Sequence, residues 1–196
     1  MQNKSNRAFT LIELMVAVSI FAIVMLIGVG ALLSLVETNR RAQAINAVMN
    51  NLNAAVESMS RSMRVGTTYY CSDSSIPPAP TALDDAQDCP DPDEGGILLA
   101  FEPAEGDASE SNDQVVYRLN GTQLERSLFS GASNTWVALT APEVSIDTFN
   151  FYVIGAPRGD GIQPRILMRI KGSATVPGGT TQFTIQSSIV QRLLDL

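Results

Sequence analysis

Two different hydrophobic patterns divide this chain. The run Leu14–Val36 is apolar and carries no charged residue, and about 20 such residues are enough for a helix to cross the hydrocarbon core of a membrane. No proline interrupts residues 9–65, so we expect the helix to continue beyond the membrane. The pattern predicts a membrane-spanning helix over residues 9–36 and an amphipathic continuation over residues 37–65, which ends at Gly66.

The amphipathic part carries one apolar stripe. Its members recur at spacings of three and four residues, as one face of a helix requires. They are Ile45, Met49, Leu52, Val56, Met59 and Met63. Because the strands that follow need a cover, we expect this stripe to pack against the chain's own sheet. A coiled-coil partner would use the same pattern.

Residues 66–196, called the head below, are predicted to be rich in β-structure. Alternating apolar positions between turn signals predict seven strands, namely Ile97–Phe101, Gln114–Leu119, Thr122–Phe129, Trp136–Leu139, Val144–Val153, Pro164–Val176 and Thr181–Val190. Asn120-Gly121 and Pro177-Gly178-Gly179 mark two hairpins, whereas the proline-rich, acidic residues 71–96 and the polar residues 103–113 are expected to be loops. A long N-terminal helix packed on an antiparallel β-sheet is an α+β fold.

One acid, Glu13, lies where the apolar helix begins. A charged carboxylate costs about 2.5–3.5 kcal/mol at the centre of a membrane helix, and less near an end, so a simple anchor gains nothing from it. A cleaved secretory signal is excluded because its apolar core has only about 7–15 residues. A plain signal anchor with the same basic flank, Lys4 and Arg7, is the alternative to a functional Glu13.

The sequence Ala8-Phe9-Thr10-Leu11-Ile12-Glu13-Leu14 follows a short basic leader and opens the apolar helix. It resembles the class III signal and N-terminal methylation motif of type IV pilins and type II secretion pseudopilins. The resemblance implies that a prepilin peptidase removes residues 1–8 by cutting between Ala8 and Phe9, and that the new Phe9 amine is methylated. Family members usually have Gly at the position of Ala8.

The resemblance also implies a pilin-like lollipop fold and a set of partners. These are other pilin or pseudopilin subunits, the prepilin peptidase and an inner-membrane assembly platform. Cutting creates a positive amine at Phe9, and we expect Glu13 of a neighbouring subunit to pair with it in a medium of low dielectric constant. Where many pilins have a helix-breaking proline this chain has Gly30, which suits either local melting of the helix or close packing of small residues.

The head is similar to J-type pseudopilins over four short segments, Val116–Leu119, Leu124–Arg126, Phe149–Tyr152 and Gln163–Arg165. With the length of the head, this similarity favours a minor subunit of a type IV pilus or pseudopilus over a principal one. Such a subunit would serve secretion, adhesion, motility or DNA uptake. The alternative is a single-span, signal-anchored membrane protein with an extracytoplasmic binding domain.

Charge and composition argue against nucleic-acid binding, enzyme activity and metal binding. The chain has 13 basic and 20 acidic residues and a formal net charge of −7, which disfavours broad binding to nucleic acid or anionic lipid. A local basic patch for DNA would use Arg158, Arg165, Arg169 and Lys171. The absence of histidine removes a Ser-His-Asp triad and the common zinc sites. We therefore expect no enzyme, no cofactor and no metal.

Three further features concern the orientation of the chain and its exported side. Lys4 and Arg7 precede the span, so the positive-inside rule places the N-terminus in the bacterial cytoplasm and the head beyond the inner membrane. Cys71 and Cys89 would form a disulfide there, with two free buried thiols as the alternative. Asp91-x-Asp93-x-Gly95 is a fragment of a calcium-loop pattern, which a solvated acidic loop would explain equally.

Overall fold

The computed structural model describes residues 9–107 and 110–192. The chain forms two compact units, Met1–Gln43 and Ala44–Leu196. Helix α1 (Leu11–Val65) contributes to both units. It is longer than most helices of globular proteins, as expected of a segment that has neither proline nor an internal capping signal over its apolar half.

In the first unit, no other part of the described chain covers the apolar side chains of α1. Every residue of the span 9–36 is exposed. A methyl group added at Gly28 or Gly30 would meet no atom within 4 Å, so neither glycine is required by contacts within this chain. The helix runs unbroken through both positions, and no melting is seen at Gly30.

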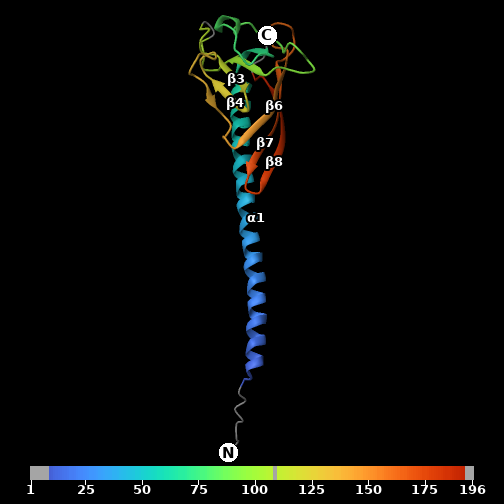
Figure 1. Cartoon of the computed structure of the whole chain (residues 1–196). Coiled ribbons are helices and arrows are strands. Elements are labelled where there is room, and N and C mark those ends of the chain that lie inside the picture. The colour runs from blue at the N-terminus through green and yellow to red at the C-terminus, as the bar shows by residue number, and fades with distance from the viewer. Residues whose placement is uncertain (1–8, 108–109, 193–196) are drawn as a thin grey trace, which may run out of the picture. The chain divides into compact units, whose positions relative to one another are not determined.

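The second unit contains two antiparallel sheets beside the last turns of α1 (Figure 1). Its strands are β1 (Thr67–Ser72), β2 (Leu98–Glu102), β3 (Val115–Asn120), β4 (Gln123–Ser127), β5 (Val137–Ala138), β6 (Val144–Ile154), β7 (Arg165–Val176) and β8 (Gly179–Val190). One sheet has the order β1-β2-β3-β4-β5 and the other β6-β7-β8. The α+β fold is confirmed, and the expected antiparallel sheet is divided into two.

The seven predicted strands are present with small shifts at their ends, but β1 was missed. Residues 71–96 were expected to be a loop throughout. This prediction is wrong at two places. Cys71 and Ser72 are the last residues of β1, and Pro80–Ala82 forms a short 3₁₀ helix. The segment Thr67–Ser72 is rich in β-branched and aromatic residues. Tyr69 and Cys71 are buried while their neighbours are half-buried, which is the alternation of a strand.

The apolar stripe of α1 enters the core only in its second half. Leu52, Met59 and Met63 are fully buried among the side chains of both sheets, and Val56 packs against them. Ile45 is half-buried, whereas Met49 is 38% exposed. Packing against the chain's own sheets is therefore confirmed for the end of the stripe, whereas Met49 is only partly covered and lies at the margin of this contact.

The predicted helix end at Gly66 is confirmed, since α1 ends at Val65. A side chain at Gly66 would place its Cβ 2.3 Å from the Phe101 ring, so only glycine fits between the helix and β2. The Tyr69 hydroxyl lies 2.7 Å from the carbonyl oxygens of both Met63 and Gly66. It therefore satisfies carbonyl groups that the helix end leaves unpaired.

Candidate functional site

The first turn of α1 is held by three reciprocal hydrogen bonds between Thr10 and Glu13. The Thr10 N–H donates to Glu13 Oε2 at 3.0 Å, and the Thr10 hydroxyl donates to the same oxygen at 2.8 Å. In return the Glu13 N–H donates to Thr10 Oγ1 at 3.3 Å. This is a capping box, in which two side chains satisfy donors that the start of a helix leaves free.

The capping box corrects one step of the sequence argument. A simple anchor does gain something from Glu13, because the carboxylate stabilises the helix start of its own chain. The Thr-x-x-Glu pattern is visible in the sequence and was missed. The presence of Glu13 therefore does not by itself separate a filament subunit from a membrane anchor.

The capping box leaves part of Glu13 available to a partner. Both hydrogen bonds use Oε2, and within the described residues Oε1 makes none. Phe9 is 82% exposed at the first described position. Ala8 and the predicted cleavage bond lie outside the described residues, so the structure places only the Phe9 side of that bond.

Beyond Glu13 the helix presents a long apolar surface. Within the described residues, α1 is the one helix that is long and apolar enough to cross a membrane, and the qualifying segment has none of its residues buried. An apolar surface of this length is stable only against lipid or against other apolar helices.

The comparison with known families decides how this helix start is to be understood. Residues 3–29 match the family described as the prokaryotic N-terminal methylation motif. The motif indicates a type IV pilin-like or pseudopilin-like protein. No curated protein and no solved structure matches the chain. In prepilin-type proteins this motif belongs to a structural subunit, and it implies assembly with other pilin subunits and contact with a prepilin peptidase. The apolar helix behind it fits a membrane-anchored pilin.

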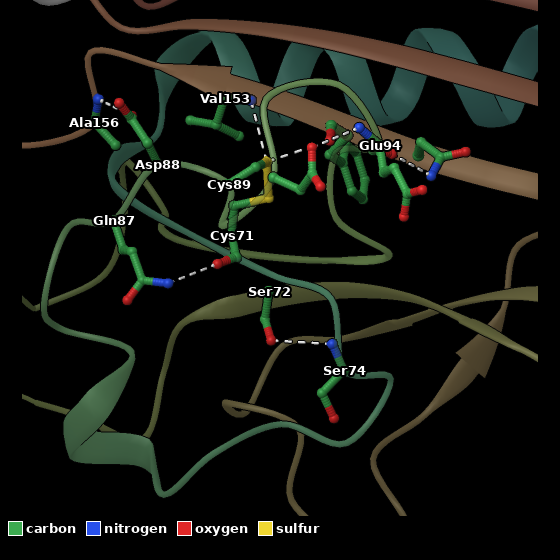
Figure 2. The surroundings of a disulfide bond; sticks show 12 residues. Cys71, Ser72, Ser74, Gln87, Asp88, Cys89, Glu94, Val153 and Ala156 are labelled. Carbon is green, nitrogen blue, oxygen red and sulfur yellow. Dashed lines mark hydrogen bonds between the residues drawn. A yellow bond between two sulfur atoms is a disulfide. The ribbon is translucent and has the colours of Figure 1, made fainter.

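The head of this pilin-like chain contains the predicted disulfide, Cys71–Cys89. Figure 2 shows how the residues around it reach both sheets. On one side, Gln87 exchanges backbone hydrogen bonds with Tyr69 and Cys71 of β1, at 2.8 and 3.1 Å. On the other, Cys89 Sγ accepts from the Val153 N–H of β6 at 3.2 Å.

The same loop binds β6 at two further points. Asp88 Oδ1 accepts from the Ala156 N–H at 2.8 Å, just beyond the end of β6. Gly96 and Phe151 exchange two backbone hydrogen bonds, at 2.8 and 2.7 Å. The segment 87–96 is therefore a connector between the two sheets, held by hydrogen bonds as well as by the disulfide.

The acids suggested as a calcium loop have other partners. Asp91 Oδ1 accepts from the N–H groups of Asp93 and Glu94 at 2.8 and 3.0 Å. These two bonds lower the pKa of Asp91. The carboxylate closes a turn of its own loop, as Asp commonly does. Among residues 9–107 and 110–192, no group of three or more acids or cysteines is arranged to hold a metal ion.

A second group of acids was not found from the sequence. Glu102 at the end of β2 is only 7% exposed, and its Oε2 lies 3.5 Å from Gln114 Nε2. The same amide donates to Asp84. In the part of the chain that the structure describes, Glu102 Oε1 and Asp113 Oδ1 are buried without a hydrogen-bond partner. Burial, followed by the charges of Asp113 and Asp84, raises the pKa of Glu102.

The suggested basic patch is divided in the structure. Arg165, Arg169 and Lys171 lie on β7, with their side chains on one face. Arg158 instead donates to Thr68 Oγ1 at 2.7 Å and lines a cavity of about 420 Å³ together with Asp84 and Glu102. Of the four residues suggested as one DNA-binding patch, three therefore share a strand face, while Arg158 lies outside β7 beside Thr68 and two acids.

Proposed function

We propose that this protein is a subunit, and specifically a minor one, of a type IV pilus or pseudopilus filament. A prepilin peptidase cuts between Ala8 and Phe9, the Phe9 amine is methylated, and residues 9–36 enter the filament core while residues 66–196 form the exported head. The observation that carries the proposal is a methylation motif at the start of a helix whose apolar side chains are uncovered. Secretion, adhesion, motility and DNA uptake are the processes in which such a filament would act.

The proposal gives Glu13 two roles, which use different oxygen atoms. Oε2 caps its own helix, and Oε1 is available to the Phe9 amine of a neighbouring subunit. Both the amine and the carboxylate are costly in hydrocarbon when alone. Their pairing would favour docking and determine the axial offset between subunits. The subunit would start in the bacterial inner membrane, on an assembly platform, with the leader in the cytoplasm.

The capping box favours one alternative function. Because it gives Glu13 a use within one chain, a single-span anchor carrying an extracytoplasmic binding domain also accounts for the residue. The alternative differs in processing, since an anchor retains residues 1–8. Intact mass of the full chain produced together with its peptidase decides between them. The filament proposal expects a chain that begins at a methylated Phe9, and a retained leader would contradict it.

Two substitutions separate the roles of Glu13 in the same experiment. Glu13→Gln removes the charge but keeps the cap, because Gln serves equally at this position of a capping box. Thr10→Ala removes the cap, which costs about 1 kcal/mol of helix stability, but keeps the charge. We expect Glu13→Gln to reduce incorporation into filaments strongly and Thr10→Ala to reduce it little, at equal membrane levels. The reverse order would assign Glu13 to capping alone.

A further inference from the structure

The second edge of β8 is the one extended strand edge of the second unit along which the described residues place no partner strand. The outer edge of β1 is covered by Gln87, and that of β6 by Gly96 and Thr122, through backbone hydrogen bonds of 2.7 to 3.1 Å. The remaining edge strand, β5, has only two residues. Strand β8 has 12 residues, and within the ranges 9–107 and 110–192 no strand pairs with its second edge. Just beyond its end, the Arg192 N–H donates to the Arg64 carbonyl oxygen of α1 at 2.8 Å, so the open part of the edge is β8 itself.

This edge has none of the features that usually protect one. Natural edge strands are short, or carry lysine, proline or a bulge that prevents pairing with another chain. The segment Gly179–Val190 contains neither a charged residue nor a proline. It pairs with β7 in continuous register from Val176↔Gly179 to Arg165↔Val190. Its backbone is therefore arranged to accept another strand.

The register identifies the backbone groups that point away from the sheet. The Gln191 N–H donates to the Pro164 carbonyl oxygen at 3.0 Å, so odd-numbered residues at this end turn toward β7. In an antiparallel ladder, alternate residues bond opposite neighbours. The even-numbered residues therefore turn their N–H and C=O groups to the free side. They are Thr180, Gln182, Thr184, Gln186, Ser188 and Val190.

The side chains beside this edge differ between the two faces of the sheet. On the solvent side, Arg169 lies opposite Gln186 and Lys171 opposite Thr184, with Arg165 further along β7. None of these three cations forms an ion pair within the described residues. On the other side, Phe183 and Ile185 are half-buried. Phe183 shares a small apolar notch with Ile45 and Met49 of α1.

We propose that β8 binds an extended segment of a different protein subunit, which pairs as an additional strand. Its side chains alternate, with apolar residues toward the notch and acidic residues beside Arg169 and Lys171. A second copy of β8 fits less well, because it carries no acid for these cations. The inference deepens the proposed function by defining a partner of the head, and it rests on that function only in taking the partner to be another subunit.

Backbone pairing is tested with a defined peptide on the full chain in detergent micelles, without peptidase. The probe is a fluorescein-labelled peptide of alternating Val and Glu, and binding is followed by fluorescence anisotropy. We expect saturable binding that weakens as salt is added. The same peptide N-methylated at alternate residues should bind about tenfold more weakly, since it lacks the N–H groups for the ladder. Equal binding of the two peptides would overturn the proposal.

Variants at one position test the protein side. Gln186→Pro removes an outward N–H and obstructs the edge, which edge strands tolerate, whereas Gln186→Val keeps the N–H and changes only the side chain. We expect the proline variant to lose about tenfold in affinity and the valine variant less than about twofold. If the proline variant does not fold, Thr184→Glu replaces it, because an acid opposite Lys171 repels the Glu residues of the peptide, with Thr175→Glu on β7 as the matched charge control. We expect Thr184→Glu to bind the peptide more weakly than Thr175→Glu does, and equal affinity of the two variants would contradict the proposal.

Three other outcomes bear on the occupant. Replacing Glu with Lys in the peptide should abolish binding, because the added cations meet Arg169 and Lys171. A single-stranded DNA oligonucleotide that binds while the Val-Glu peptide does not would assign the basic row to nucleic acid and overturn the proposal. A dimer that Gln186→Pro dissociates would assign the edge to a second copy. Because no step depends on cleavage, failure here and failure of the proposed function are distinguishable.

Discussion

Two carboxylates show how the same group serves different ends according to its surroundings. Glu13 is exposed and receives hydrogen bonds from Thr10, whereas Glu102 is buried beside Asp84 and Asp113 with one oxygen unpartnered. A charged group that is buried without a partner is destabilising, and the neighbouring acids add repulsion. Glu13 therefore stabilises its helix, while ionised Glu102 opposes folding of the head.

The raised pKa of Glu102 predicts a loss of stability as pH rises. Its pKa lies above the ordinary value of 4.5 in the folded chain, so the folded state holds the proton more tightly than the unfolded state. Stability then falls as pH increases from about 4.5 through the raised value. Glu102→Gln cannot ionise and should be more stable than the parent at pH 7, with a smaller decline between pH 4 and pH 7.

Urea unfolding of a soluble fragment beginning near Glu37, measured at several pH values, gives this comparison. Glu105→Gln is the control, because Glu105 is an exposed acid of the same segment. It should leave the pH dependence close to that of the parent. A Glu102→Gln variant that declines as steeply as the parent would show that another group causes the effect.

In helix α1, the amphipathic part offers two positions for a matched test of burial. Leu52 is 1% exposed within the core, and Met49, one turn earlier on the same predicted stripe, is 38% exposed. Leu52→Ala should cost about 2–5 kcal/mol of unfolding free energy, because it leaves a cavity. Met49→Ala should cost less than about 1 kcal/mol. Denaturant unfolding of the same fragment measures the stability of both variants. Equal losses would show that the buried face of the helix is assigned wrongly.

Most helices and strands of the structure could be predicted from the sequence. Periodicity predicted the helix and seven strands, and Asn120-Gly121 and Gly66 predicted a turn and a helix end, since each signal is local. The strand β1 was missed because its short run merges with a proline-rich loop. The division into two sheets could not be predicted, since it depends on contacts such as Gly96 with Phe151 between distant segments.

The candidate sites, too, could be predicted where their residues are neighbours in sequence and not where the fold brings distant residues together. The helix-start site was found because its residues are adjacent in sequence, and the capping box between Thr10 and Glu13 was equally available there. The acidic group of Asp84, Glu102 and Asp113 was not predictable, because only the fold brings these three loop and strand residues together. Local spacing indicates chemistry along one helix, but it does not show which distant acids share a buried space.

Hydrogen bonds, a disulfide and a shared core all join the two sheets of the head. The segment 87–96 is hydrogen-bonded to β1 and β6, and the Cys71–Cys89 disulfide joins Cys71 of β1 to Cys89 of this segment. The side chains of Leu52, Met59 and Met63 also contact both sheets in one core. A connector that is held by hydrogen bonds and a shared core should keep the sheets together even without the covalent link.

The double variant Cys71→Ser/Cys89→Ser tests this balance. In the chain-entropy model a loop of this size contributes about 3 kcal/mol, but the hydrogen bonds of Gln87, Asp88 and Gly96 do not depend on the sulfur atoms. We therefore expect the variant to lose less stability than Leu52→Ala and to unfold in one transition. Two separate transitions would show that the disulfide is what couples the sheets. If the cysteine variant unfolds while Leu52→Ala behaves like the parent, the stripe of α1 serves neighbouring subunits instead, and the filament core extends farther along the helix than Val36.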